Sequence, residues 1–201
     1  QMVAEFIAKG EKVIVFSRWR EVTRALQKRY SDPEKYGVLI NDPQTRQPLK
    51  DVGVAYMDGN TAVKARQVQI RDFQTKAQKR IFVTTYGTGG ESVTLTAASR
   101  VVLFDAEWAP PIHPINRAHR LGQKKEVESY YLVIKNTIDP RIVLLHKQKE
   151  RTLMQAIEGE FGPDAFESEV AEFMHEQMFS RIGGVTTAYS PIFTGSLLLG
   201  A

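Results

Sequence analysis

Short apolar runs rich in β-branched residues recur along the chain and predict strands. The runs at residues 81–85 and 101–104 do not alternate polar with apolar positions, a pattern typical of parallel strands that are buried on both faces. Similar runs lie before and after them. The predicted strands occupy residues 12–16, 54–57, 81–85, 101–104 and 128–134.

The segments between these runs carry apolar residues at helical spacing and predict helices. Ser17 and Thr61 are placed to cap two of these helices, and Pro114 and Gly122 bracket a short helix over residues 115–121. Further helices are predicted at residues 1–9, 139–158 and 164–179, and the helix after Ser17 is expected to turn inward Trp19, Val22, Leu26 and Tyr30.

Strands that alternate with helices predict an α/β fold in which helices flank a parallel sheet. In such a sheet the loops at the carboxyl ends of the strands share one edge, and ligands bind there. We therefore expect that edge to gather the loops that follow the strands, at residues 17–19, 58–61, 86–92 and 105–108.

Charge is distributed unevenly along the chain. Residues 1–158 carry 26 lysines and arginines against 17 acidic residues, a net charge of +9, whereas residues 159–201 carry 1 against 6, a net charge of −5. A basic body suggests a polyanionic partner, although ordinary surface charge is the plain alternative. We divide the chain into a domain at residues 1–158, with an insertion at 31–52, and an acidic helical extension and tail that offers a helix to a protein partner.

Composition narrows the classes of site and partner. The chain has no cysteine, which excludes disulfides and cysteine-ligated metal sites, and its histidines lack the spacing to acidic residues that is typical of metal ligands. No apolar run approaches the roughly 20 residues that a membrane span needs. We expect no metal ligands, no membrane partner and an intracellular location, in the nucleus or in the cytoplasm or nucleoid.

A glycine loop at residues 87–92 follows one of the buried strands, so its backbone amides suit an anion. It is not a Walker A loop, because no Gly-Lys dipeptide occurs in the chain. Asp105 ends the next strand, as in a dinucleotide-binding unit, but the glycine loop has Ser92 where that unit needs a small residue and leaves too few residues for a crossover helix. A loop with glycines for tight turns alone remains the simple alternative.

Arg117 and Arg120 lie three residues apart on the predicted helix over residues 115–121, so both guanidiniums share one face. Two parallel forks of hydrogen-bond donors suit the oxygens of a phosphate group. An Arg-x-x-Arg pair is often only surface charge, but its position after a strand and a glycine loop favours a binding role.

Four segments together resemble one known family. NRAHRLGQKKEV is similar to motif VI of the Swi/Snf-type ATPases of helicase superfamily 2, and TGGESVTLTAASRVVLFDAEWAP resembles their motif V and the segment after it. YMDGNTAVKARQVQIRDF resembles their Leu-Asp-Gly motif with its downstream arginine, and KVIVFSRW resembles motif IV. The four segments occur in family order between residues 12 and 145, and such a series is far more specific than any single motif.

The resemblance implies the second of two RecA-like lobes, which bind ATP with Mg2+ between them and move on double-stranded DNA. The magnesium ligands are expected on the N-terminal lobe, which we expect to precede Gln1 in the same polypeptide. Arg120 would be the arginine finger, with Arg117 beside it on the polyphosphate. Further nucleotide contacts are implied for Gly90, Ser92 and Thr94, and DNA-backbone contacts for Ser17, Arg18, Trp19, Gly59, Asn60, Thr61, Thr84, Thr85, Tyr86, Gly87, Thr88 and Trp108.

Two alternative functions stay open at this point. One is a non-catalytic nucleic-acid-binding or interaction module, against which the paired arginines beside motif V argue. The other is an RNA-directed superfamily 2 helicase, against which the segment AHRLGQ at residues 118–123 argues. We expect the 201 residues alone not to hydrolyse ATP, because the phosphate loop and the magnesium-binding acids belong to the first lobe.

Overall fold

The structure is a computed structural model, and it describes most of the first 157 residues together with one later strand. The described residues are 2–36, 38, 40, 52–88, 93–107, 112–134, 137–157 and 187–193. The predicted acidic helix at 164–179 lies outside them, as does most of the predicted insertion at 31–52.

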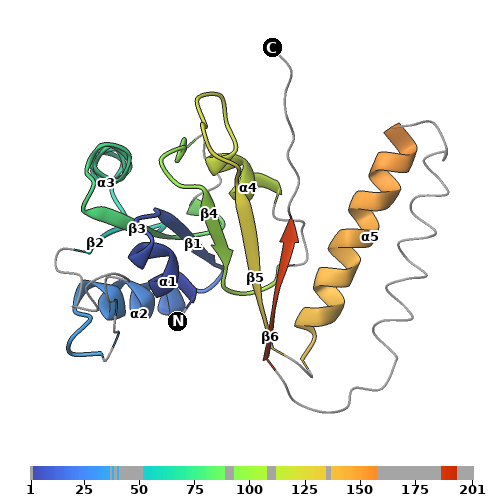
Figure 1. The fold of residues 1–201 in the computed structure, drawn as a ribbon, viewed down its shortest axis with the longest axis horizontal. Helices are drawn as coiled ribbons and strands as arrows, with labels where there is room; N and C mark the ends of the chain where they lie inside the picture. The colour runs from blue at the N-terminus through green and yellow to red at the C-terminus, as the bar shows by residue number, and fades with distance from the viewer. Residues whose placement is uncertain are drawn as a thin grey trace. The chain divides into compact units, whose positions relative to one another are not determined.

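A six-stranded sheet with the order β2-β3-β1-β4-β5-β6 forms the centre of the fold (Figure 1). β1 pairs in parallel with β3 on one side and β4 on the other, and the β2–β3 and β4–β5 pairs are also parallel. The five-stranded parallel sheet that the sequence predicts is thereby confirmed. The strands are β1 (Val13–Ser17), β2 (Gly53–Met57), β3 (Lys79–Thr85), β4 (Arg100–Leu103), β5 (Glu128–Ile134) and β6 (Thr187–Phe193).

The central strands are buried because helices cover both faces of the sheet. Every side chain of β1 is buried, as are the last five of β3 and the last three of β4. Figure 1 shows α2 and α3 on opposite sides of the β2–β3 end of the sheet. Phe73 of α3 meets Phe82 of β3 edge to face, with 5.2 Å between ring centroids. The helices are α1 (Met2–Ala8), α2 (Arg20–Ser31), α3 (Val63–Thr75), α4 (Ile112–Ala118) and α5 (Asp139–Ile157).

The chain separates into two compact units. The first comprises residues 1–105, 111–131 and 190–201, and the second comprises residues 106–110 and 132–189. The candidate site described below lies in the first unit. In the second, Ile142, Val143 and Leu145 of α5 are buried. Of the helices that the structure describes, none combines the length and the apolar character needed to cross a membrane.

Two helix starts differ from those predicted. The residue before α2 is Trp19, which is 56% exposed rather than turned inward, and Ser17 is the last residue of β1. The residue before α3 is Ala62, because the hydroxyl of Thr61 bonds to Asp58 instead of capping the helix. In both cases the polar side chain bonds to a group in the loop between strand and helix.

The short helix predicted at residues 115–121 is also displaced. α4 spans Ile112–Ala118, so Arg117 is in its last turn and Arg120 lies beyond its end. The two arginines therefore do not share one helical face as predicted. Gly122, whose φ of +98° favours glycine, follows in the turn after the helix.

Candidate functional site

The carboxyl ends of the parallel strands meet at one edge of the sheet, as the sequence predicts. Ser17 at the end of β1 is paired with Thr85 at the end of β3, and Met57 at the end of β2 is paired with Thr84. Leu103 ends β4 beside Phe16. The loops that follow β1, β2, β3 and β4 therefore leave the sheet side by side.

Asp105, two residues after β4, holds the loop that follows β1. Its carboxylate accepts a hydrogen bond from the hydroxyl of Ser17 and one of 2.8 Å from the backbone N–H of Arg18. The backbone N–H of Trp19 in turn donates to the Ser17 oxygen at 3.1 Å. Asp105 is not among the predicted site residues. The sequence does place it at the start of the loop at residues 105–108, which is expected at this edge of the sheet.

Tyr86 connects the loop after β3 to the same point. Its backbone N–H donates to the carbonyl of Ser17 at 3.2 Å, and its hydroxyl donates to the carbonyl of Asp105 at 2.7 Å. Its ring stacks on Phe16, with 5.8 Å between centroids and 13° between planes. The loops after β1, β3 and β4 are thus one hydrogen-bonded assembly.

Asp58 organises the loop that follows β2. Although the residue is only 3% exposed, its carboxylate accepts hydrogen bonds from the Tyr56 hydroxyl at 3.0 Å, the Asn60 N–H at 3.0 Å and the Thr61 hydroxyl at 3.1 Å. The N–H of Asp58 donates to the Thr61 oxygen at 2.9 Å. This pattern folds residues 58–61 around one carboxylate.

Two arginines of α2 approach the same carboxylate. Oδ2 of Asp58 lies 3.6 Å from Nε of Arg20 and 3.4 Å from Nη2 of Arg24. Burial raises the pKa of Asp58, but hydrogen bonds from Tyr56, Asn60 and Thr61, together with the positive charge of Arg24, outweigh it and hold the pKa below its ordinary value of 3.8. Asp58 is therefore ionised at neutral pH.

Four of the predicted DNA-contacting side chains are buried within the lobe. The hydroxyl of Ser17 is bound to Asp105, and that of Thr85 donates to Thr88 at 2.8 Å. The buried four are Ser17, Thr84, Thr85 and Thr88. Exposed positions in the same loops are Arg18, Trp19, Gly59, Asn60 and Gly87, with Thr61 and Tyr86 half-buried. The guanidinium of Arg18 lies 5.5 Å from the centroid of the Trp19 ring.

The arginine pair joins the end of α4 to the segment before β4. Arg117 is 3% exposed, and its carbonyl accepts the N–H of Leu95 at 2.9 Å. Arg120 is exposed, and its guanidinium donates to the Thr94 hydroxyl at 3.1 Å. Burial and the nearby charge of Arg120 lower the pKa of Arg117. The pair is thus divided between a buried guanidinium and an exposed one.

Gln123, which ends the segment AHRLGQ but is not among the predicted site residues, holds this turn in place. Its amide nitrogen lies 2.8–3.1 Å from the carbonyls of Thr96, Ala98 and Ala118, to which it donates. Its amide oxygen accepts the N–H groups of Lys124 and Lys125. A single side chain therefore ties the segment that carries Arg120 to the segment that carries Thr94.

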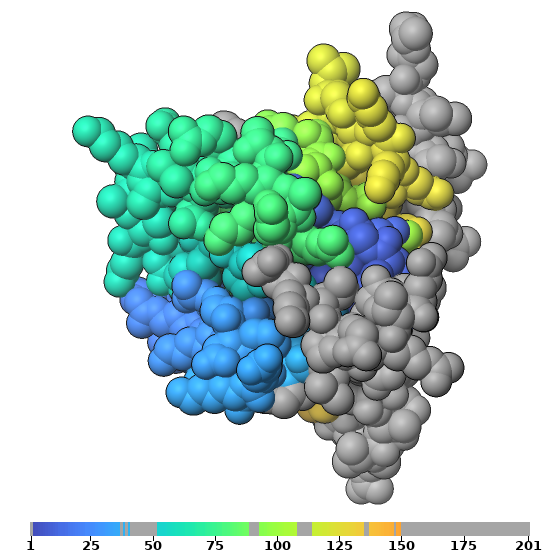
Figure 2. Space-filling view, turned by 60° about the vertical axis from the view of Figure 1, so that its left-hand side comes forward, coloured from blue at the N-terminus to red at the C-terminus, as the bar shows by residue number. Residues whose placement is uncertain are grey.

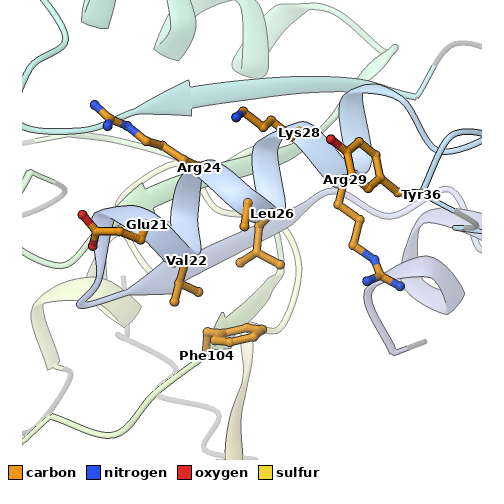
Figure 3. A pocket seen from close by; sticks show the side chains of 9 residues that line it. Glu21, Val22, Arg24, Leu26, Lys28, Arg29, Tyr36 and Phe104 are labelled. Carbon is orange, nitrogen blue, oxygen red and sulfur yellow. The ribbon is translucent and has the colours of Figure 1, made fainter.

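A hollow of about 520 Å³ opens beside α2. Figure 3 shows Val22 and Leu26 of the helix facing Phe104, with the charged ends of Arg24 and Lys28 directed away from that ring. The described residues that line the hollow include none of the predicted site residues. Arg24, which lines the hollow, also approaches the Asp58 carboxylate, so α2 borders both the hollow and the loop after β2.

Three of the predicted site residues, Gly90, Ser92 and Trp108, lie outside the described residues. Within the described part of the chain, no group of three or more histidine or acidic side chains is arranged to hold a metal ion.

Comparisons with known proteins agree with this geometry. The model of the family described as "Helicase conserved C-terminal domain" matches residues 1–122. The chain is 36% identical over 160 residues to the chromatin-remodeling ATPase INO80 of Mus musculus, which covers 78% of this chain and 9% of that protein. It is 38% identical over 111 residues to the INO80 ATPase of Drosophila melanogaster, which covers 54% of this chain and 7% of that protein. The chain therefore spans less than a tenth of the length of these relatives.

A solved structure is similar as well. The crystal structure of the C-terminal part of the Fun30 ATPase domain superposes with a TM-score of 0.56 at 29% sequence identity. The match covers 68% of this chain and 40% of that one. The parallel sheet with flanking helices is thus the fold of a helicase C-terminal lobe.

Proposed function

Because this chain belongs to the family of helicase conserved C-terminal domains and is related to Snf2-family chromatin-remodelling ATPases, we propose that it is the second motor lobe of an ATP-dependent translocase on double-stranded DNA. The partner that completes the motor is an N-terminal RecA-like lobe. The observation that carries the proposal is the exposed guanidinium of Arg120, which Thr94 holds beside the buried Arg117.

Arg120 is the arginine finger in this proposal. Its guanidinium is planar and always charged, so it suits the oxygens of a γ-phosphate that gains charge during transfer to water. In related nucleotide hydrolases an arginine in this role contributes roughly 10³–10⁵ to the turnover number. Arg117 is the neighbouring cation on the polyphosphate in the same proposal, and from its buried position it adds positive potential beside Arg120.

ATP with Mg2+ is the nucleotide that relatedness to ATPases implies, and the residues of this lobe fit one half of its site. Two cations and the Thr94 hydroxyl suit a polyphosphate and a sugar. When bound, ATP supplies the phosphoryl group that is transferred to water. Gly90 and Ser92 would add contacts in the same proposal, and the magnesium ligands would come from the first lobe.

DNA would lie along the loops that follow β1, β2 and β3. Gly59 and Gly87 support this assignment, because nothing in the described part of the lobe requires glycine there. Neither backbone is left-handed, and an added Cβ would meet only Oγ1 of Thr88 at 3.9 Å from Gly59 and nothing among the described atoms from Gly87. Exposed glycines without an internal reason fit a phosphate backbone that approaches closely.

The remaining predicted DNA contacts stay proposals of two kinds. The exposed Arg18, Trp19 and Asn60 would touch DNA with their side chains, as would Trp108. The buried threonines would act through the backbone that they shape. Because such contacts are made to DNA phosphates, the lobe should bind duplexes with little preference for base sequence.

The test is substitution of Arg120 in a protein that contains both lobes. Arg120→Ala should lower the turnover number for ATP by at least a hundredfold, because the lost interaction forms mainly in the transition state. Arg120→Lys should restore little, because an ammonium lacks the planar fork. The measurement is steady-state ATPase activity with and without duplex DNA.

Arg71 provides the matched control for this test. Its side chain is 69% exposed on α3 and is not among the proposed nucleotide contacts, so Arg71→Ala removes the same charge from another position. DNA affinity should change little in the Arg120 variants. Turnover that survives in Arg120→Ala would overturn the arginine-finger assignment and favour a non-catalytic nucleic-acid-binding module.

A further inference from the structure

The loop at residues 59–61 is held from the side of α3 by one arginine. Nε of Arg66 donates to the carbonyl of Thr61 at 2.8 Å, and Nη2 donates to the carbonyl of Gly59 at 3.2 Å. One planar guanidinium therefore fixes two carbonyls that lie two residues apart. Both carbonyls are thereby bonded to a side chain of α3.

The carboxylate of Asp58 also holds this loop. That carboxylate takes the N–H of Asn60 and the hydroxyl of Thr61, and the arginines of α2 neutralise it. The space-filling view shows α2 (blue) and the segment of residues 52–88 (cyan to green) as adjoining parts of one face (Figure 2). The loop is thus held by two charged side chains, the carboxylate of Asp58 and the guanidinium of Arg66.

The contacts of Asp58 and Arg66 together are more than a turn between a strand and a helix needs. Asp58, Asn60 and Thr61 already form a turn closed by the Thr61 N–H, which donates to the carbonyl of Asp58 at 3.0 Å. Arg66 adds no residue to the core, because it is only half-buried and bonds to the outer part of the loop. What it does add is a fixed orientation for Gly59 and Asn60, which are exposed.

We propose that Arg66 and Asp58 are positioning residues that hold the 59–61 loop in the shape that receives a DNA phosphate. The proposal rests on the proposed function, because it takes DNA as the ligand of this edge. Neither residue touches the phosphate. Their effect is to spare the loop the entropy cost of becoming ordered when DNA binds.

The geometry of Arg66 makes it possible to distinguish the positioning role from an effect of its positive charge alone. A lysine keeps the positive charge, but all its N–H groups leave one nitrogen, whereas two different nitrogens of the Arg66 fork bind the Thr61 and Gly59 carbonyls. Arg71 lies on the same helix, pairs with Asp72 at 3.6 Å and is well exposed. It therefore serves as a matched site where loss of charge leaves the loop intact.

The experiment measures binding of the 201-residue chain to a fluorescent DNA duplex for Arg66→Lys, Arg66→Gln and Arg71→Gln. Both Arg66 variants should bind about tenfold more weakly, the loss expected for one or two hydrogen bonds that preorganise the loop. Arg71→Gln should weaken binding by no more than about twofold to threefold, as one removed surface charge does. Melting curves of the variants show whether the fold is kept.

A second readout follows the loop itself without DNA. Amide hydrogen exchange at residues 59–61 should become faster in Arg66→Lys and in Asp58→Asn, while exchange in β1 stays unchanged. In a protein with both lobes, Arg66→Lys should raise the DNA concentration for half-maximal ATPase stimulation and leave the maximal rate within about twofold. A merely structural residue would lower both together.

The possible results are distinguishable. If the wild-type chain fails to bind duplex DNA, the proposed function falls, and this inference falls with it. If the wild type binds but Arg66→Lys binds equally well, or the loop exchanges no faster, the positioning role is wrong and Arg66 acts only as a charge. Weaker binding with faster exchange at residues 59–61 supports the proposal.

Discussion

At the scale of single residues, two aspartates that follow parallel strands organise the candidate site. Asp58 and Asp105 each accept a backbone N–H from a loop, and each also binds a hydroxyl, that of Thr61 or of Ser17. A carboxylate has several acceptor positions, so one buried side chain can fix several donors. The acids therefore shape the loops, and Arg18 and Arg120 are the exposed cations nearby that we propose for phosphate.

Replacement of Asp58 by asparagine should destabilise the 201-residue chain in a pH-dependent way. The folded pKa lies below 3.8, so the carboxylate contributes stability above that pH, and the contribution is lost as the pH falls through the lower folded pKa. At pH 7, Asp58→Asn should lower the free energy of unfolding by about 1–3 kcal/mol, because the amide leaves donors unmatched. The measurement is urea unfolding at neutral and at acidic pH.

Below pH of about 3.8 the difference between Asp58→Asn and the wild type should shrink, since the wild-type carboxylate becomes protonated as well. Asp72 is the control, because its carboxylate pairs with Lys76 at 2.7 Å on the surface of α3, where water screens the pair. Asp72→Asn should cost less than Asp58→Asn. An equal loss of stability at both pH values would contradict the role of the Asp58 charge.

At the scale of elements, the apolar runs predict all five parallel strands within two residues at either end. Burial on both faces leaves a continuous run of β-branched and aromatic residues in a strand, as in β1. The start of α4 is predicted less well, because Pro114 occupies its third residue. The first four N–H groups of a helix have no internal partner, so proline fits there as well as at the first position.

The site is only partly readable from the sequence. Arg120 and the Gly59 loop are predicted from local motifs. Asp105, by contrast, bonds to Ser17 and Arg18, which precede it in the sequence by 88 and 87 positions. Such contacts depend on strand order, which local patterns do not specify. Arg66 could have been singled out, because it is one of the two arginines downstream of the Leu-Asp-Gly-like motif. Gly90, Ser92 and Trp108 stay predictions.

Gln123 links two elements of the nucleotide half of the site, so its loss should disturb both. Gln123→Ala leaves the carbonyls of Thr96, Ala98 and Ala118 without this donor and should lower the free energy of unfolding by about 1–3 kcal/mol. Gln123→Glu should be worse at neutral pH, because a carboxylate would face three carbonyl oxygens. Thermal melting of both variants, with ATPase activity of the two-lobe protein, measures the effect.

A matched substitution nearby tests whether this role is specific. Gln74 also bonds to the 96–97 segment, but from α3, where it donates to the Thr96 hydroxyl and accepts the N–H of Ala97. Gln74→Ala should lower stability while leaving the turnover number nearly unchanged, because it does not touch the Arg120 turn. If Gln123→Ala and Gln74→Ala reduce turnover equally, Gln123 has no particular part in placing Arg120.

At the scale of the whole molecule, charge decides how the chain meets a polyanion. The first 158 residues carry a net charge of +9 and the remainder a net charge of −5, so the two parts should affect DNA binding in opposite directions. Contacts with phosphates release counterions, so affinity for duplex DNA should fall steeply and linearly in a plot of log affinity against log salt. Different duplex sequences should bind alike.

The acidic segment gives the sharpest test of this view. β6 lies at the edge of the sheet in the last part of the chain, so a truncation after residue 158 would remove a strand as well as charge. Four conservative substitutions avoid that: Glu167→Gln, Glu169→Gln, Glu172→Gln and Glu176→Gln raise the net charge from +4 to +8.

Together these four substitutions should strengthen duplex binding severalfold at about 50 mM salt. The gain should largely vanish at about 300 mM, where screening confines charge effects to a few ångströms. Anisotropy titrations across this range measure both. Weaker binding in the substituted chain would mean that the glutamates support the DNA surface, and a gain that persists at high salt would rule out a long-range electrostatic cause.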